Sequence, residues 1–304
     1  MASSLTNLVL DIAAEDCVAA AKKLLAPLAR FAKSFNAAES EVGDTVKVPV
    51  FSNAVAAEFA SGSNDYTSAS AAGVDGKSIE LDSHPWASKR LLPDDDMETA
   101  AGKDWARQTT ISTVKAVCKA VVNKVLLCAM KATGVTPLTI TGTNALQKIK
   151  NMRKSCIAAG INPADAVVLL PSDLYSDLLS ELPYNIVGVQ DAMVNGFVEK
   201  LFGFGYIAEL QDEVSYVNGS SKKVTLDAMI VANGAIGFAG RLPKVQNTDQ
   251  FEVSDITDDE TGLAVRIRAT GTNAVDARFL GAEVICGCQA LKPAEILVAS
   301  TTAT

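Results

Sequence analysis

The longest regular pattern of apolar positions in the chain lies between Met97 and Thr133. Apolar residues recur there three and four positions apart, which is the spacing of one face of an α-helix. They are Ile111, Val114, Cys118, Val121, Val125, Cys128 and Ala132. Lys103, Arg107, Lys115 and Lys119 are spaced by multiples of four on the other side. The segment contains no Pro, so we expect one helix of roughly 50 Å, a rod suited to a flat and extended subunit.

The first 36 residues show a second helical pattern. Leu5, Leu8 and Ile12 form one apolar stripe, and Leu24, Leu28, Phe31 and Phe35 form another. Pro27 lacks a backbone donor, so we expect it to kink or divide this helix. No core for the segment is evident in the sequence, which predicts an arm that reaches a neighbour. The alternative is a first helix packed on its own domain.

Strand alternation brackets a long stretch with few large apolar residues. Val46, Val48 and Val50 alternate, and Ile79 and Leu81 resume the alternation after residues 52–78, which are rich in Ser, Ala, Gly and Asn. A stretch of about 25 residues without a core pattern is unusual inside a compact domain. The sequence therefore predicts a long projecting hairpin, with a disordered surface loop as the alternative.

The second half of the chain alternates helices and strands and then becomes purely strand-like. A helix is predicted from Asn144 to Ala159, a strand buried on both faces over Ala166–Leu170, and a helix starting at Pro171–Asp173. Further predicted strands lie near Tyr206 and over 224–232, 244–256, 263–268, 283–291 and 296–299. This order predicts an α/β layer followed by antiparallel β structure.

Composition and charge narrow the function. The chain has 304 residues, 48% of them hydrophobic, and a formal net charge of −8. The negative charge argues against a protein that grips nucleic acid through its phosphates. No apolar run is long enough for a transmembrane helix, and the N-terminus lacks the pattern of a signal peptide.

The order of elements resembles the major capsid protein of tailed bacteriophages, the Hong Kong 97 fold. Five stretches carry the resemblance: GDTVKVP, SIELDSHPWA, residues 97–133, AVVLLPSDLYSDLL with GFVEKLFGFGYIAEL, and GLAVRIRA with LKPAEILVA. The implied fold is α+β. It has an N-terminal arm (1–42), an extended loop called the E-loop with its flanking strands (43–93) and a spine helix of the peripheral domain (94–143). An α/β axial domain (144–240) and an antiparallel peripheral sheet with the C-terminus (241–304) follow.

The resemblance implies a structural protein without enzyme activity, cofactor, metal or catalytic residue. Its copies would assemble as pentamers and hexamers into an icosahedral shell that encloses packaged double-stranded DNA without reading its sequence. Portal, scaffolding or decoration proteins would be further partners. The expected location is the virion capsid, assembled in the host cytoplasm and away from membranes. We expect intersubunit contacts from Leu24, Leu28, Phe31, Phe35, Phe59, Tyr66, Lys77, Trp86 and Tyr184.

Two alternatives stay open. One is an encapsulin-like compartment that encloses a cargo enzyme, and the other is an α/β enzyme with a small-molecule pocket near Pro171 to Tyr175. His84 is the only histidine, so any Ser–His or Cys–His mechanism would depend on it. The six cysteines fit reduced structural roles. Asp94–Asp96 is expected to be a solvated helix start, and a Lys77–Asn247 crosslink is conceivable but not predicted.

Glycines cluster at Gly203 and Gly205 and again at Gly234, Gly237 and Gly240. Their spacing gives neither the dinucleotide fingerprint nor the phosphate-binding loop of nucleotide-binding proteins. We therefore expect these glycines to permit tight turns.

Overall fold

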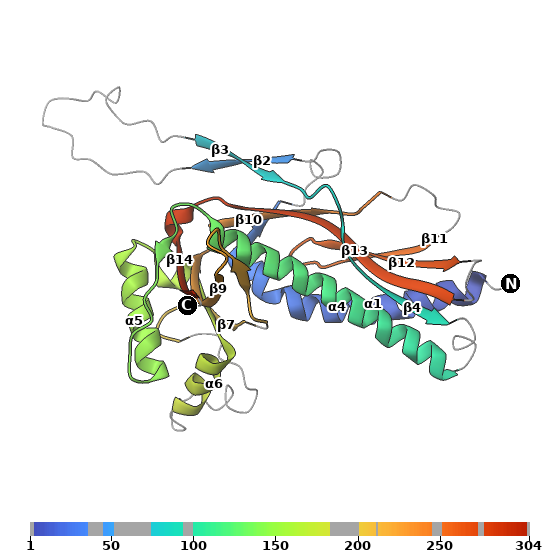
Figure 1. Cartoon of the computed structure of the whole chain (residues 1–304), viewed down its shortest axis with the longest axis horizontal. Helices are drawn as coiled ribbons and strands as arrows, with labels where there is room; N and C mark the ends of the chain where they lie inside the picture. The colour runs from blue at the N-terminus through green and yellow to red at the C-terminus, as the bar shows by residue number, and fades with distance from the viewer. Residues whose placement is uncertain are drawn as a thin grey trace, which may run out of the picture.

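The structure is a computed structural model, and it describes residues 3–35, 45–51, 74–93, 100–182, 201–210, 212–244, 251–272 and 277–302. Two six-stranded sheets organise it. The first has the order β1-β10-β13-β12-β11, with β4 also paired to β13, and the second has the order β5-β14-β9-β6-β7, with β8 paired to β9. Figure 1 shows an elongated molecule in which α1 and α4 run along the first sheet, while α5 and α6 accompany the second.

The strands of the first sheet are β1 (Ala32–Ser34), β4 (Trp86–Pro93), β10 (Ile236–Arg241), β11 (Phe251–Thr257), β12 (Ala264–Thr272) and β13 (Ala277–Ala290). Those of the second are β5 (Thr136–Pro137), β6 (Ala166–Leu170), β7 (Tyr206–Glu209), β8 (Ser215–Val217), β9 (Lys223–Ala232) and β14 (Ile296–Thr302). Two short 3₁₀ helices, η2 (Pro163–Asp165) and η4 (Pro293–Glu295), precede β6 and β14.

Helix α4 (Ala100–Lys131) confirms the predicted rod. In the repeating stripe Val114, Cys118, Val121 and Val125 are buried and Ile111, Cys128 and Ala132 are half-buried, while Lys115 on the opposite side is exposed. The long strand β13 runs beside the helix (Figure 1). The apolar stripe therefore faces the first sheet, and this burial stabilises a helix far longer than an average one.

Helix α1 (Ser3–Phe31) corrects two expectations. It runs through Pro27 without division, and it packs along α4 of its own subunit. Cys17, Ala21, Leu25, Leu28 and Phe31 form a buried stripe at helical spacing. Packing on both sides of Pro27 outweighs the loss of one helical hydrogen bond, which explains why the helix continues. Over residues 17–31 the helix is packed on its own body, as the alternative interpretation held.

The α/β layer follows the prediction closely. All five residues of β6 are buried, as expected for a strand covered on both faces. Helix α5 (Ala145–Ala158) starts at Asn144, whose side chain accepts a hydrogen bond from Gln147 N, and Gly160 with φ +76° follows its C-terminus. Helix α6 (Ser172–Glu181) ends at Glu181, whose carboxylate accepts from the free N–H groups of Ala145 and Leu146. The negatively charged carboxylate of Glu181 therefore links the C-terminal end of α6 to the N-terminus of α5.

The closing strand does not lie where the sequence resemblance placed it. β14 pairs with β9 and β5 in the second sheet, so it does not complete the sheet that contains β12. Conversely, β10, assigned from sequence to the axial part, pairs with β13 in the first sheet. Strand partners are chosen by long-range packing, which the alternation of single strands does not encode. The hairpin of β11 and β12 is confirmed, with Thr257 opposite Ala264.

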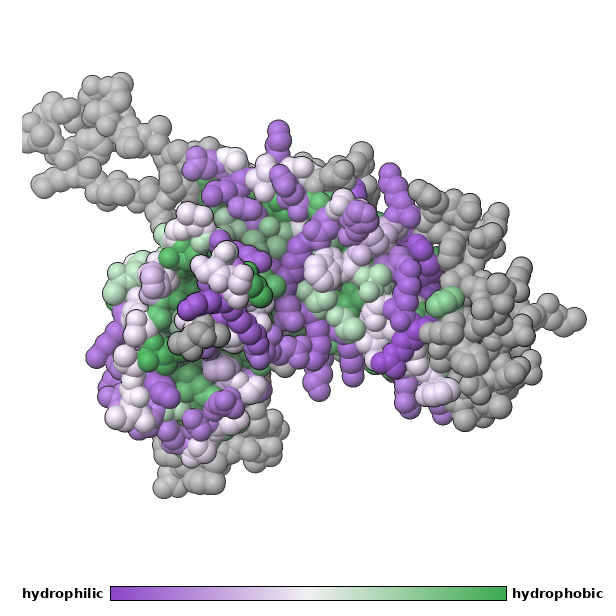
Figure 2. All heavy atoms as spheres, viewed as in Figure 1, coloured by the Kyte–Doolittle hydropathy of each residue, from purple (hydrophilic) through white to green (hydrophobic). Residues whose placement is uncertain are grey.

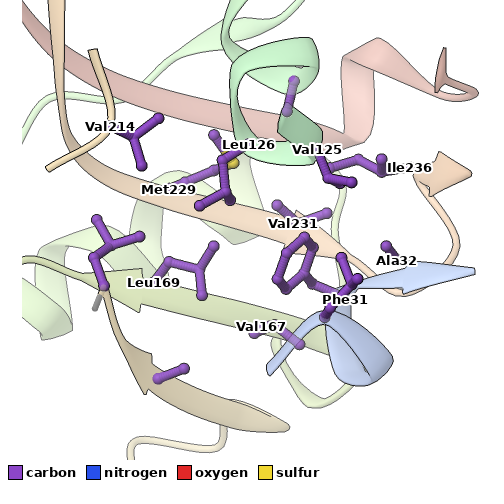
Figure 3. Close-up of a cluster of buried hydrophobic side chains, with 14 of the residues drawn as sticks. Phe31, Ala32, Val125, Leu126, Val167, Leu169, Val214, Met229, Val231 and Ile236 are labelled. Atoms are coloured by element: carbon purple, nitrogen blue, oxygen red, sulfur yellow. The ribbon is translucent and has the colours of Figure 1, made fainter. Parts of the chain in front are cut away.

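One continuous core joins the two sheets. Figure 3 shows Phe31 at the end of α1, Leu126 of α4, Leu169 of β6 and Met229 and Val231 of β9 within the same cluster. All five side chains are buried. Because side chains from both sheets and both long helices meet there, the described parts of the chain form a single packed body around this junction.

Candidate intersubunit surfaces

A two-stranded hairpin stands apart from both sheets. β2 (Thr45–Phe51) and β3 (Val74–Glu80) pair antiparallel, in a register that runs from Thr45 opposite Glu80 to Phe51 opposite Val74. Figure 1 places this pair at the margin of the molecule, above β10 and β13. Val46, Val48 and Ile79 are buried, and Lys47 and Glu80 are exposed. The two flanking strands are therefore confirmed, while residues 52–73 between them lie outside the described part.

The base of the hairpin is seated on the first sheet by close backbone contact. A Cβ atom at Gly287 of β13 would lie 2.2 Å from the carbonyl oxygen of Glu80. A Cβ atom at Gly237 of β10 would lie 3.1 Å from the Cδ1 atom of Ile79. At position 287 only glycine allows the backbone of Glu80 to come this close, whereas a Cβ atom at position 237 would require neighbouring side chains to shift. We call this contact, with its buried residues Val46, Val48, Ile79, Leu81, Ala239, Ile285 and Leu291, the hairpin seat.

The seat corrects one interpretation of the glycines. Gly234 has φ +78° between β9 and β10 and serves a tight turn, as predicted. Gly237 lies inside β10, where its missing side chain makes room for Ile79 and Phe35. The sequence shows a glycine at position 237, but it does not show which distant segment packs against that glycine.

A polar cluster fixes the chain directly after the hairpin to helix α4. The amino group of Lys124 forms an ion pair with Asp82 and donates a 2.6 Å hydrogen bond to the carbonyl oxygen of Cys286. Trp86 Nε1 donates to Asp82 Oδ2 at 2.6 Å, and Lys124 Nζ lies 6.0 Å from the centre of the Trp86 ring. Lys124 therefore holds together the spine helix, strand β13 and the chain that leaves the hairpin.

Replacing Lys124 with Ala is expected to lower the free energy of unfolding by about 1–3 kcal/mol. The Lys124 side chain is only 18% exposed, and the substitution removes the ion pair of Asp82 and the 2.6 Å hydrogen bond to the Cys286 carbonyl oxygen, which keep only uncharged donors. Lys119→Ala is the matched control on the same helix, since the Lys119–Asp212 pair is 42% and 38% exposed. Exposed pairs contribute about 0–1 kcal/mol. Urea unfolding of both variants would measure the difference, and equal losses would contradict the assigned role of Lys124.

The structure divides the predicted contact residues into three groups. Leu28 and Phe31 have no exposed surface, so the prediction that they contact a neighbour is wrong, because they fill the core of their own subunit. Leu24, Phe35 and Lys77 are half-buried, and Trp86 is 41% exposed. Phe59, Tyr66 and Tyr184 lie outside the described residues, as do Asn247 and Asp94–Asp96. Intersubunit contact by the second group stays a prediction.

Sequence reasoning missed several apolar side chains that the subunit leaves uncovered. The most exposed are Val217 on β8, at 68%, and Trp105 on α4, at 55%. Ile157, Phe202 and Val253 are also exposed. The exposure of Trp105 could have been predicted from the sequence, because Trp105 lies outside the apolar stripe of its helix and close to Arg107 in the chain. Figure 2 shows apolar residues on the displayed face as separate patches among hydrophilic ones.

An open hollow of about 400 Å³ lies where the enzyme alternative placed a pocket. Its lining is Pro171, Ser172, Asp173, Leu210, Asp212, Glu213, Thr225, Leu226 and Asp227. Lys119 pairs with Asp212, and Thr301 donates to Asp227 at 2.6 Å. Lys223 lowers the pKa of Glu213 through a hydrogen bond and its charge. Asp212, Glu213 and Asp227 are thus engaged in surface ion pairs and hydrogen bonds.

The lining of the hollow holds no histidine or cysteine for a Ser–His or Cys–His mechanism. Ser172 donates to the carbonyl oxygen of Leu210 at 3.4 Å. His84 lies after the hairpin and contacts Ser83. Within the described ranges, no group of three or more His, Cys, Asp or Glu side chains could hold a metal ion. None of the described helices is long and apolar enough to cross a membrane.

Comparison with known proteins identifies the fold. No family model matches the chain, and no curated protein sequence matches it. The capsid of Ralstonia phage GP4 matches with a TM-score of 0.56 at 10% identity, over 91% of this chain and 90% of that one. The capsid of cyanophage P-SCSP1u matches with a TM-score of 0.55 at 11% identity, over 88% and 85%. The virus-like particle from Pyrococcus furiosus matches with a TM-score of 0.52 at 12% identity, over 94% and 96%.

These similarities define the class first: the chain has the fold of capsid proteins. Within that class it has the Hong Kong 97-like arrangement, as the sequence resemblance predicted. The likeness extends over nearly the whole chain at very low identity, so the backbone arrangement is shared while most side chains differ.

Proposed function

We propose that this chain is the major capsid protein of a tailed bacteriophage. Its copies assemble as pentamers and hexamers into an icosahedral shell, with no enzymatic step. The observation that carries the proposal is the capsid fold itself, which covers 91% of this chain and 90% of the Ralstonia phage GP4 capsid chain. The support is therefore an analogy from a fold that the two chains share over about nine tenths of their lengths.

Two features of the subunit support assembly. The hairpin seat holds β2 and β3 at the margin of the body, from which residues 52–73 would extend to a neighbour. Scattered apolar side chains such as Trp105 and Val217 remain uncovered on the single chain. Shells built from rings need several different contact surfaces on each copy, because head-to-tail contacts repeat around every ring.

Double-stranded DNA is the proposed content of the shell. The net charge of −8 gives little attraction for phosphates, so packaged DNA could slide along the inner wall instead of binding tightly. Portal, scaffolding or decoration proteins would complete such a particle in the host cytoplasm. The second candidate is an encapsulin-like compartment with a cargo enzyme, which the likeness to the Pyrococcus furiosus virus-like particle supports.

The content of purified particles separates the two candidates. Particles isolated from the natural source would be treated with nuclease, opened and analysed for DNA and for co-purifying proteins. We expect nuclease-protected double-stranded DNA of uniform length. Particles that hold one enzyme in fixed ratio to the shell protein and lack protected DNA would contradict the viral assignment and favour the compartment.

A further inference from the structure

Two of the six cysteines face each other across the interior of the subunit. Cys128 lies on α4 and Cys288 on β13, and these two elements pack against each other. Both are half-buried, whereas Cys17, Cys118, Cys156 and Cys286 are buried. The fold and the proposed shell function assign no role to these two cysteines.

The surroundings place the two sulfur atoms side by side. Cys288 Sγ lies 3.6 Å from the carbonyl oxygen of Lys124, one helical turn before Cys128. A helical side chain covers the turn that precedes its own Cα atom, so the thiol of Cys128 lies over the same carbonyl. Cys286 shares the face of β13 with Cys288, because the two are separated by one residue. The pair therefore spans the contact between the spine helix and the strand that carries the hairpin seat.

The electrostatics of the pair are asymmetric. The hydrogen bond with Cys288 is the largest cause that lowers the pKa of Cys128 to about 7, assisted by a backbone hydrogen bond at Ala290 and the charge of Lys124, against burial. The same hydrogen bond and burial raise the pKa of Cys288. Burial raises the pKa of Cys17 and Cys118 to about 12 and of Cys156 and Cys286 to about 11. Cys128 is thus the thiol most readily ionised near neutral pH.

We propose that Cys128 and Cys288 form a disulfide modification site, which latches helix α4 to strand β13 when the protein meets a small-molecule disulfide such as oxidised glutathione. The thiolate of Cys128 attacks one sulfur of the oxidant, which breaks the oxidant's S–S bond and releases one glutathione thiolate. Cys288 then loses its proton to that thiolate and attacks Cys128 Sγ, which releases the second glutathione. The protein loses two hydrogens and two electrons, and the oxidant gains them.

The latch closes a loop between residues 128 and 288, and that loop includes the whole α/β layer. A crosslink that closes a long loop restricts the unfolded chain. It also fixes the spine helix one turn from Lys124, which anchors the chain after the hairpin. We therefore expect the oxidised protein to unfold at a higher urea concentration than the reduced protein. The fold allows Cys128 and Cys288 to be free thiols during synthesis and to form the disulfide afterwards.

The test is a peptide map of the folded full-length chain after incubation with oxidised glutathione. We expect an intact mass lower by about 2 Da and one linked peptide pair that contains Cys128 and Cys288. In Cys288→Ser the resolving thiol is missing, so one glutathione should remain on Cys128. Cys156→Ser, which removes a buried thiol outside the pair, should behave as the unchanged protein does.

A second measurement needs no substitution. Iodoacetamide at pH 7 should alkylate Cys128 at least about tenfold faster than Cys156, because only the thiolate reacts. Stable glutathione on Cys128 of the unchanged protein, without a linked peptide, would overturn the proposal. So would a map in which Cys128 and Cys288 stay reduced while the chain remains folded. Either result concerns the thiol pair alone and leaves the shell proposal to its own test.

Discussion

Replacing Gly287 with Ala is expected to abolish assembly and to lower the free energy of unfolding by about 1–3 kcal/mol. The added Cβ atom would lie 2.2 Å from the carbonyl oxygen of Glu80 and 3.1 Å from the Cα atom of Leu81. Both are backbone atoms, so no side chain can rotate away to relieve the clash. The base of the hairpin must then lift from β13, which uncovers Ile79 and displaces the strands that are proposed to reach neighbours.

Gly76→Ala is the matched control for this substitution. Gly76 lies in β3, in the same hairpin, and a Cβ atom there would meet nothing within 4 Å. Its unfolding free energy should stay within about 0.5 kcal/mol of the original, and shells should form in normal yield. Urea unfolding and sedimentation of assembled material measure both effects. A Gly287→Ala protein with unchanged stability and normal particles would contradict the existence of the hairpin seat.

Shortening the hairpin should separate folding from assembly completely. Residues 52–73 can be replaced by Asn-Gly, because Phe51 and Val74 are the last opposed pair of β2 and β3 and a two-residue turn suits such a pair. The seat residues Val46, Val48 and Ile79 remain, so the subunit should keep its stability. The removed segment is the one proposed to extend to a neighbour, so closed shells should be lost.

Unfolding curves and electron microscopy of the shortened protein give the two readouts. An unchanged urea midpoint together with the absence of particles is the expected outcome. Normal particles from a chain that lacks residues 52–73 would refute the proposed contact role of this segment. A loss of both stability and particles would show that the segment belongs to the core of its own subunit, which would also refute the proposal.

The sequence predicted those elements whose own side chains identify the buried face. The stripe from Val114 to Val125 predicted α4, the unbroken apolar run of 166–170 predicted β6, and the alternation of Val46 and Val48 predicted β2. In each case the periodicity of burial follows directly from the geometry of one helix or strand. The Asn144 cap and Gly160 marked the ends of α5 for the same local reason.

The wrong predictions concern features that depend on which distant segment packs against an element, and not on the periodicity of the element itself. The stripe that contains Leu28 and Phe31 required burial, but it did not indicate whether α4 of the same chain or a neighbour would cover it. The strand over 296–302 pairs with β9, although its composition suits either sheet equally well. The role of Gly287 and the contact of Cys128 with Cys288 depend on segments distant in sequence. Long-range contacts of this kind leave no local trace.

Electron microscopy of the purified 304-residue protein, at the concentrations reached in cells, tests most directly whether copies of this chain assemble into a shell. We expect closed shells of uniform size, built from copies of this chain, with residues 52–73 of each copy in contact with another copy. A homogeneous monomer under these conditions, whose residues 52–73 pack against their own subunit in an experimental structure, would contradict this expectation.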